Sequence, residues 1–350
     1  MAGKSTRVTL QDISDKTGYG RSTVSLALRD HPSIKESTRK KIRSEAEKLG
    51  YRPNPLVSVL MAQLKGKHKD YRETIAVLVK TAYVAEQMTS ASPFYGMLYD
   101  SIKKKAAEQG FSVDLFCADE LGVSASRLSR IFLSRGIHGV LIFPGGSTAS
   151  GERLDIQLDW QYFVSVLVGF NGNYQELNQV VPDYTYDVNI AIEMLHRSNR
   201  ERVGFAIPKS RNRGSDYNWM ARFLLYQREL PVRRRIPFVP EKGSDFGKEE
   251  FLVWFQKHTP DTLLVAGDEV RNWLEEAGVS IPDDVRLINL VKRGEAGLAG
   301  IDPQTSEVGG AAVELLISLL QSNQYGIPQY PRTIAVKGAW NPGKSFPEHS

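Results

Sequence analysis

Arg21 and Ser22 stand at the start of the run RSTVSLALRD, where their side chains could reach the edges of DNA bases. The run follows the turn GYG, and its apolar residues Val24, Ala27 and Leu28 form a stripe at helical spacing. A recognition helix presents its first residues to the major groove, where Arg can donate two hydrogen bonds to guanine. The alternative for Arg21 is a contact with phosphate alone.

The flanking residues predict the elements that would hold this helix. Thr9 is a candidate N-cap, and Leu10 and Ile13 recur at helical spacing until Gly18, which tolerates the left-handed conformation that ends helices. Two short helices joined by a turn of three or four residues form a helix-turn-helix. A third helix is expected over about 37–49. Its inward-facing residues would be Ile42, Ala46 and Leu49.

Other polar and basic side chains near these helices could contact the DNA backbone. Hydroxyl groups can donate to phosphates or cap helices, and both readings stay open for Thr9, Thr23, Ser25 and Thr38. Arg29 and Lys35 flank the second helix and would supply charge.

The distribution of charge supports a polyanionic partner at one end of the chain. Residues 1–72 carry 16 Lys and Arg against 7 Asp and Glu, whereas residues 73–350 carry 29 against 33. A basic head on a mildly acidic body is typical of a protein that binds nucleic acid through one domain. A solubilising basic tail is the alternative on charge alone.

Two sequence stretches carry a resemblance to a known family. VTLQDISDKTGYGRSTVSLAL and STRKKIRSEAEKLGYRPNP resemble, in order, the DNA-binding domain of the lac repressor family of bacterial regulators. The resemblance implies a homodimer that binds a pseudo-palindromic operator in double-stranded DNA. Leu26 departs from the pattern, because many members have a basic residue there that reads bases. Leu26 could touch a thymine methyl group or face inward, so we expect an unusual operator.

The segment YRPNPLVSVLMA follows the head. In the family this segment is a short helix that inserts a leucine into the minor groove, and such wedges bend the duplex. The resemblance places this wedge on Leu60, with Asn54 and Ser58 beside it. The alternative is that the apolar residues of the segment pack permanently against the body.

The body alternates apolar strand-like runs with helical stretches. Examples of the strands are TIAVLV, FSVDLFC, HGVLIFP, RVGFAI, TLLVAG and DVRLINL. Such alternation predicts parallel sheets wound with helices on both faces. The body also resembles the effector-binding core of the same family, which implies a two-lobed fold like that of periplasmic binding proteins. The whole is an α/β chain behind an all-α head.

The expected domains follow from these patterns. Residues 1–52 would form the helix-turn-helix domain, and 53–72 the hinge helix and linker. Residues 73–350 would form the effector-binding and dimerisation core. We place its first lobe at 73–182 and 305–328, and its second lobe at 183–304 and 329–350.

Ligands of open α/β sheets bind at the carboxyl ends of the strands. Arg213 and Ser215 follow the strand RVGFAI, and Asp268 follows TLLVAG. The family resemblance adds Phe94 and Tyr95, an aromatic pair that lines the ligand cleft in relatives. For each of these residues packing, capping or simple solvation is the competing reading. Together they predict a small-molecule effector, a sugar or related metabolite, held between the lobes.

The sequence contains few features that indicate an enzyme. It has no phosphate-binding glycine motif, no zinc-binding HExxH, and six histidines without metal-ligand spacing. Cys117 is the single cysteine. We therefore expect no catalytic residues, no metal and no cofactor. The first residues have no secretory pattern, and no run of about 18 apolar residues occurs, so a cytoplasmic protein is expected.

The sequence as a whole predicts a sequence-specific DNA-binding transcription regulator, acting as a repressor whose operator affinity responds to a small molecule. One alternative is a solute-binding protein of a transport system, which would share the body but lack the basic head. A second is a DNA binder with a degenerate, silent sensor site.

Overall fold

The N-terminal head is a bundle of three helices. The computed structural model describes residues 10–28, 34–49, 73–90, 92, 94–118, 125–143, 158–169, 176–198, 201–241, 243, 245–291 and 297–347. Within the head, the helices are α1 (Leu10–Thr17), α2 (Arg21–Leu28) and α3 (Glu36–Lys48). Each is too short to be stable alone, so their packing against one another must hold them together.

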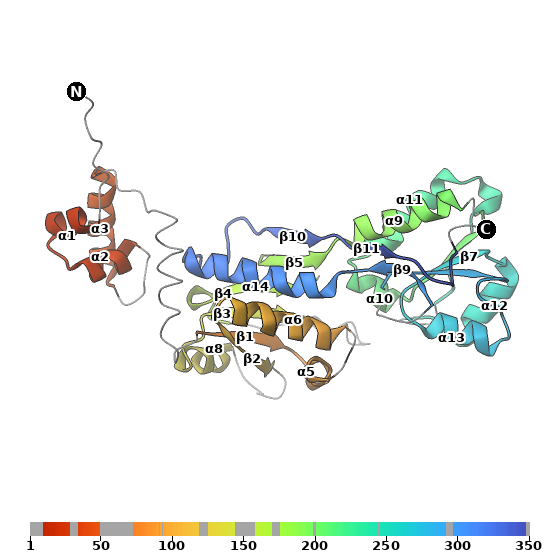
Figure 1. The fold of residues 1–350 in the computed structure, drawn as a ribbon, viewed down its shortest axis with the longest axis horizontal. Coiled ribbons are helices and arrows are strands. Elements are labelled where there is room, and N and C mark those ends of the chain that lie inside the picture. The colour runs from red at the N-terminus through yellow and green to blue at the C-terminus, as the bar shows by residue number, and fades with distance from the viewer. Residues whose placement is uncertain are drawn as a thin grey trace, which may run out of the picture.

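The first lobe of the core is built on a parallel sheet with the strand order β10-β5-β4-β3-β1-β2. Its strands are β1 (Thr74–Val79), β2 (Ser112–Cys117), β3 (Gly139–Phe143), β4 (Val164–Val168), β5 (Asn178–Pro182) and β10 (Thr333–Val336). Helices α5 (Ala82–Thr89), α6 (Tyr95–Glu108), α8 (Ala125–Ser134) and α14 (Thr305–Gln321) belong to this lobe (Figure 1).

Continuous apolar strands allow this sheet to be covered on both faces. Along β1, Ile75, Val77 and Val79 join the hydrophobic core beneath α6 and α14. Ala76 and Leu78 join a separate core beneath α8. Because successive side chains of a strand point to opposite faces, a strand buried on both sides must be apolar at every position. Residues 75–79, IAVLV, meet that requirement, and the polar Thr74 lies half-buried at the start of the strand.

The second lobe repeats the plan on a smaller sheet, ordered β11-β9-β8-β7-β6. Its strands are β6 (Val203–Ala206), β7 (Thr262–Val265), β8 (Arg286–Asn289), β9 (Ala299–Asp302) and the antiparallel edge strand β11 (Ala339–Asn341). Its helices are α9 (Tyr184–Arg197), α10 (Lys209–Gly214), α11 (Asn218–Glu229), α12 (Lys248–His258) and α13 (Glu269–Glu276). Short 3-10 turns lie at Trp160–Tyr162 and Val232–Arg234.

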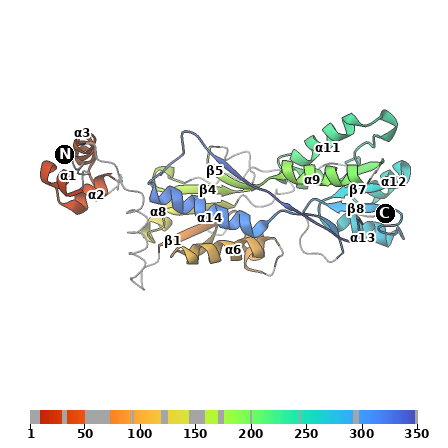
Figure 2. The same ribbon diagram turned by 45° about the horizontal axis from the view of Figure 1, so that its top comes forward.

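The chain passes from one sheet to the other three times. It crosses from β5 into α9, from β9 into α14, and from β10 into β11 (Figure 2). The first and third crossings touch, because the Asp183 backbone N–H donates to the Val336 carbonyl at 2.7 Å. The two lobes are therefore joined by three adjacent segments and not by a single linker.

The structure corrects one expected boundary. We expected 329–350 to belong wholly to the second lobe, but β10 pairs with β5 in the first sheet. The Gln179 backbone N–H donates to the Arg332 carbonyl at 2.9 Å at the start of this pairing. After α14 the chain first forms β10, which pairs with the edge strand β5 of the first sheet, and then crosses to the second sheet.

The close pairing of β8 and β9 yields a test of the second lobe. A Cβ atom added at Gly300 would lie 2.0 Å from the backbone oxygen of Asn289. Backbone atoms cannot move aside as a flexible side chain could, so Gly300→Ala should destabilise the fold by at least about 1–3 kcal/mol. A lowered thermal unfolding midpoint of the full chain is the readout.

Gly214→Ala is the matched control for this substitution. Gly214 lies at the end of α10, and a Cβ atom added there would meet no other atom within 4 Å. Replacing such a glycine should leave stability unchanged or raise it by roughly 0.4–1 kcal/mol. Equal loss from both substitutions would contradict the packing described for β8 and β9.

Candidate functional site

The buried core of the head fixes the orientation of α2. Val24 and Ala27 of α2 are fully buried, as are Ile13 of α1 and Ile42 of α3. Residues at positions i and i+3 lie on one face of a helix, so burying Val24 and Ala27 turns the opposite face outward. The inward-facing residues that we predicted for this bundle are confirmed at these positions.

The turn between α1 and α2 has the geometry that its glycine predicted. Gly18 adopts a φ of 73°, in the left-handed region. The Ser14 hydroxyl then donates to the Tyr19 carbonyl at 2.7 Å, which ties the end of α1 to the turn. The turn sets α2 at its angle to α1.

Arg21 and Ser22 are exposed at the N-terminal end of α2. Arg21 makes no ion pair or side-chain hydrogen bond with any described residue, so its guanidinium donors are available. Thr23, Ser25 and Leu26 are half-buried on the flanks of the helix. This is the arrangement that a base-reading helix needs, with its long donor at the exposed tip and shorter side chains behind it.

The remaining predicted DNA contacts divide into two groups. Lys35 is exposed just before α3, and Thr38 is half-buried in its first turn. Five others lie outside the described residues: Thr9, Arg29, Asn54, Ser58 and Leu60. The capping role of Thr9 and the hinge helix with its leucine wedge therefore stay predictions.

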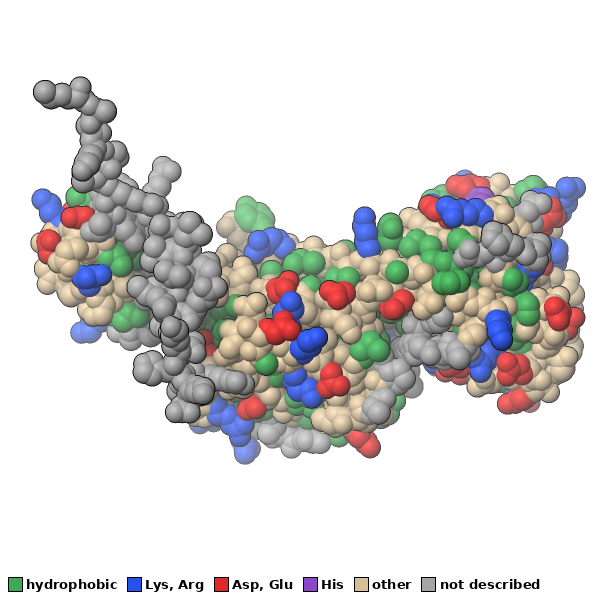
Figure 3. Space-filling view, viewed as in Figure 1, with side chains coloured by type: hydrophobic (Ala, Val, Ile, Leu, Met, Phe, Trp, Pro, Cys, Tyr) green, Lys and Arg blue, Asp and Glu red, His purple; other side chains and the backbone are tan. Residues whose placement is uncertain are grey.

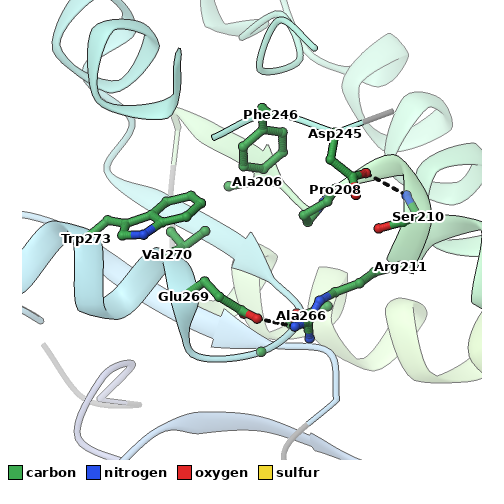
Figure 4. Close-up of a pocket in the computed structure, with 11 residues that line it drawn as sticks. Ala206, Pro208, Ser210, Arg211, Asp245, Phe246, Ala266, Glu269, Val270 and Trp273 are labelled. Carbon is green, nitrogen blue, oxygen red and sulfur yellow. Dashed lines mark hydrogen bonds and ion pairs between the residues drawn. The ribbon is translucent and has the colours of Figure 1, made fainter. Parts of the chain in front are cut away.

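A pocket of about 290 Å³ opens at the carboxyl ends of β6 and β7 in the second lobe (Figure 4). It is lined by Ala206, Pro208, Ser210, Arg211, Asp245, Phe246, Ala266, Gly267, Glu269, Val270 and Trp273. This volume is at the lower limit of small-molecule sites. Its position is the one that strand direction predicts for a ligand of an open α/β sheet.

Arg211 is the central polar group of this pocket. Its guanidinium donates to the Ala266 carbonyl at 2.7 Å and forms an ion pair with Glu269 at the start of α13. A Cβ atom at Gly267 would lie 2.3 Å from the Arg211 Nη1 atom, and Gly267 has a φ of 113°. Only glycine leaves room for the arginine here, and only glycine tolerates this backbone angle without strain.

Asn289 anchors the glycine from the neighbouring strand. Its side-chain oxygen accepts from the Gly267 backbone N–H at 3.3 Å and from the Val291 N–H at 3.0 Å. Asn289 is fully buried at the end of β8. This bridge holds the ends of β7 and β8 together beneath the pocket.

Aromatic and acidic side chains complete the pocket wall. Phe246 and Trp273 meet edge to face, with ring centroids 6.4 Å apart. Asp245 accepts from the Ser210 backbone N–H at 2.8 Å, in the first turn of α10. Figure 4 shows these groups and the Arg211–Glu269 pair arranged around one space. The wall thus combines two flat apolar rings with one basic and two acidic side chains.

The structure separates the two residues that we expected after β6. Arg213 is exposed and is not part of the pocket, whereas Ser215 is fully buried. The Ser215 hydroxyl donates to the Asn212 carbonyl at 2.8 Å, so it serves the local turn. Neither residue lines this pocket, and their role at a ligand stays a prediction. Arg211, two residues earlier, lines it from the first turn of α10.

Asp268 precedes α13, but its side chain does not cap that helix. It is not among the residues lining the pocket, although both of its sequence neighbours are. The capping alternative is therefore not what the structure contains, and the ligand role stays a prediction. Trp273 of α13 also lines the pocket.

Phe94 and Tyr95 lie at the start of α6 in the first lobe. Their rings meet edge to face at 5.1 Å, and Tyr95 meets Phe143 at the end of β3 at 5.9 Å. Both are half-buried against the first-lobe core. Packing thus accounts for part of each ring, while their position at the carboxyl end of β3 keeps the ligand role available as a prediction.

Within the described residues no group of three or more His, Cys, Asp or Glu side chains could hold a metal ion. Cys117 is buried, and its thiol donates to the Lys80 carbonyl at 3.2 Å. Among the same residues, no helix is both long and apolar enough to cross a bilayer.

Comparison with known proteins identifies both parts of the chain. Residues 9–54 match the family model of bacterial regulatory proteins, lacI family, and residues 192–346 match a periplasmic binding protein-like domain. The chain belongs to the lacI family. This regulator is therefore a DNA-binding transcription factor with a ligand-binding type of core, and the expected family and fold class are confirmed.

Individual relatives agree with this assignment. Catabolite control protein A of Priestia megaterium is 22% identical over 345 residues, covering 94% of this regulator and 98% of the relative. The HTH-type transcriptional regulator YkvZ of Bacillus subtilis is 24% identical, covering 89% and 93%. These relatives are regulatory proteins, and a solute-binding protein would not share the helix-turn-helix domain.

Solved structures of the same fold include two regulators seen with ligands. The transcriptional regulator CelR in complex with cellobiose has a TM-score of 0.57 at 17% identity, covering 97% of this chain and all of that one. The lac repressor dimer bound to operator and an anti-inducer has a TM-score of 0.53 at 15% identity, covering 97% and 99%. At these identities the likeness supports the fold alone.

The close fit of Arg211 against Gly267 gives a test of the pocket. Gly267→Ala should displace the guanidinium and strain the backbone, and we expect it to lower stability by roughly 1–3 kcal/mol from strain alone, with the collision added to this. Gly278→Ala is the matched control, because Gly278 has a φ of 77° and open space around it. Thermal unfolding midpoints measure both.

A double-mutant cycle isolates the collision itself. In an Arg211→Ala background, Gly267→Ala should cost less, because only the backbone strain and the contact with the Glu269 Oε2 atom, 2.6 Å from the added Cβ atom, remain. Additive losses from the two substitutions would show that the guanidinium does not lie against Gly267.

Proposed function

We propose that this regulator is a homodimeric repressor that reads a two-fold symmetric operator through α2 and releases or tightens its hold when a small, uncharged polar molecule binds the core. The observation that carries the DNA-reading part is the exposed Arg21, which pairs with no described residue, at the tip of a helix whose other face is locked by Val24 and Ala27.

The distribution of charge supports DNA binding by the head and not by the core. The head region, 1–72, has an excess of nine positive charges, while 73–350 has a net charge of −4. On the face of the core drawn in Figure 3, acidic and basic side chains are interspersed over both lobes. Lys and Arg neutralise phosphates and release counterions, so affinity for DNA should reside in the head and fall with salt.

The pocket chemistry supports an uncharged polar effector. Arg211 is already paired with Glu269, and Asp245 adds a second acidic group. An anionic ligand would meet two carboxylates with the one guanidinium already occupied. A sugar-like molecule, in contrast, could stack a flat face on Phe246 or Trp273 and share hydroxyl hydrogen bonds with the polar groups.

The domains expected from the sequence supply the mechanism. We infer that residues 1–52 read the operator and that 53–72 form a hinge which folds on the DNA, with Leu60 as the wedge and Asn54 and Ser58 beside it. The effector would sit between the lobes, facing Phe94 and Tyr95, and would act by binding one lobe arrangement better than another. A regulator that binds operator DNA works in the bacterial cytoplasm.

A silent sensor is the second candidate, and one observation favours it. The Arg211–Glu269 ion pair and the Arg211–Ala266 hydrogen bond satisfy the arginine without any ligand. In that case the regulator would bind its operator constitutively.

The role of Arg21 can be tested on an operator obtained by in vitro selection from random DNA. Arg21→Ala should weaken binding by roughly 1–3 kcal/mol on the selected operator, with relaxed preference at one base pair. Arg21→Lys keeps the charge but loses the bidentate fork, so it should also lose that preference. Gel-shift titrations against single-base operator variants provide the measurement. An equal loss on every DNA sequence, restored by lysine, would reduce Arg21 to a phosphate contact.

The effector proposal can be tested by thermal shift with matched ligand panels. Neutral mono- and disaccharides are compared with sugar phosphates and sugar acids. A neutral ligand at about 100 times its dissociation constant should add roughly 2.7 kcal/mol of stability, and Arg211→Ala should abolish the shift. Shifts given only by the anionic panel would contradict the pocket argument, and no shift with either panel would favour the silent sensor.

A further inference from the structure

Asp187 is a carboxyl group buried where the three crossing segments meet. It lies in the first turn of α9, directly after the first crossing, and is fully buried. Its Oδ1 atom accepts from the Gly338 backbone N–H, in the third crossing, at 2.9 Å. Its Oδ2 atom is also buried and has no hydrogen-bond partner among the described residues. A buried carboxylate with an unpartnered oxygen is costly, and a protonated carboxyl, which carries no charge, costs much less.

The charged groups on the surrounding elements do not relieve this cost. Asp183 at the start of α9 and Asp302 at the end of β9 carry the same charge as a deprotonated Asp187. Lys337, before β11, places its ammonium over the Tyr186 ring at 4.7 Å. Arg222, on the neighbouring helix α11, donates to Asn189. Neither cation pairs with Asp187.

These surroundings favour the protonated carboxyl. Burial raises the pKa of Asp187 to about 7. The Gly338 N–H opposes the rise, and the nearby Asp183 and Asp302 carboxylates add to it. The group would thus change its protonation state near neutral pH, far above the range of an ordinary aspartate.

Packing around Gly338 closes the Oδ1 side of this carboxyl, and the Oδ2 atom is itself buried. A Cβ atom at Gly338 would lie 2.5 Å from the Asp187 Oδ1 atom and 2.8 Å from the Asp302 carbonyl oxygen. Three backbone segments therefore converge on the carboxyl group. Movement of the third crossing away from α9 would open this carboxyl to water.

We propose that Asp187 is a positioning residue whose proton holds the crossing segments together, so that losing the proton loosens the third crossing and shifts the arrangement of the two lobes. Gly338 lies between β10 of the first sheet and β11 of the second, so it belongs to the third crossing itself. Releasing Gly338 from α9 of the second lobe would free the segment that joins the two sheets. The effect of this contact on operator affinity rests on the proposed function, but the contact between Asp187 and Gly338 does not.

The stability of the full chain provides the first test. Between the ordinary carboxyl pKa near 4 and the raised value near 7, the folded chain keeps a proton that the unfolded chain has lost, so stability falls as pH rises. Asp187→Asn is neutral and keeps the acceptor for Gly338. The unfolding equilibrium constant of wild type relative to this variant should rise by up to about tenfold per pH unit between pH 5 and 6.5, and level off above pH 7 to 8.

Asp183→Asn is the matched control. Asp183 caps the same helix by accepting from the Tyr186 backbone N–H at 3.0 Å, and Asn is an equally good cap. This variant should keep the fall of stability with rising pH, but the fall should level off at a somewhat lower pH, because the Asp183 carboxylate adds to the rise in the Asp187 pKa. If Asp187→Asn does not fold, Asp187→Ser, smaller and also neutral, replaces it in the comparison.

Hydrogen exchange distinguishes a moving crossing from a local stability effect. After correction for the chemical exchange rate, amides of 333–341 should exchange faster at pH 8 than at pH 6 in the wild type, and equally in Asp187→Asn. Operator affinity measured over the same pH range should lose part of its pH dependence in that variant. Parallel pH profiles of wild type and Asp187→Asn in stability and exchange would overturn the proposal. If hydrogen exchange shows the expected difference between wild type and Asp187→Asn but the chain binds no operator, the proposed function is refuted and the role of Asp187 is not.

Discussion

The triple crossing of the chain between two sheets is the constraint on which the core depends. Each sheet is buried on both faces, so each lobe is complete as a packed unit. The three adjacent crossings are what couple the lobes, and the first and third share a backbone hydrogen bond from Asp183 to Val336. A relative motion of the lobes must therefore be absorbed in a few residues of these segments. That geometry suits a protein whose two arrangements must be close in free energy.

The same constraint determines where chemistry can occur. Parallel strands all end at one edge of a sheet, and the loops that leave β6 and β7 meet there to form the pocket. Gly267 and Asn289 bring these ends close enough for Arg211 to lie across them. In the head, the burial of Val24 and Ala27 has the equivalent effect, because it leaves Arg21 as the exposed tip of α2. In both places a buried apolar or backbone contact positions an arginine.

The sequence predicted most of this architecture, since the signals were local. Continuous apolar runs such as IAVLV favour strands buried on both faces, and the period of α2 placed Val24 and Ala27 inside. It was harder to predict which residue of a short helix lies nearest to the end of the preceding strand. Arg213 and Arg211 both follow β6, and only the start of α10 decides which of them reaches the strand end. The edge strand β10 was also missed, because residues 333–336 pair with a strand about 150 positions earlier. Nothing local in the sequence signals that partner, and the burial of Asp187 depends on segments equally distant along the chain.

Symmetric, sequence-specific binding of DNA by the full chain can be tested by a DNase I footprint on genomic fragments enriched by its binding. A dimer that reads DNA in this way should protect one region made of two half-sites related by two-fold symmetry, spaced by about one helical turn or a small multiple of it. Uniform protection along every fragment, without a shared palindrome, would contradict it and would leave the head as a general binder of DNA.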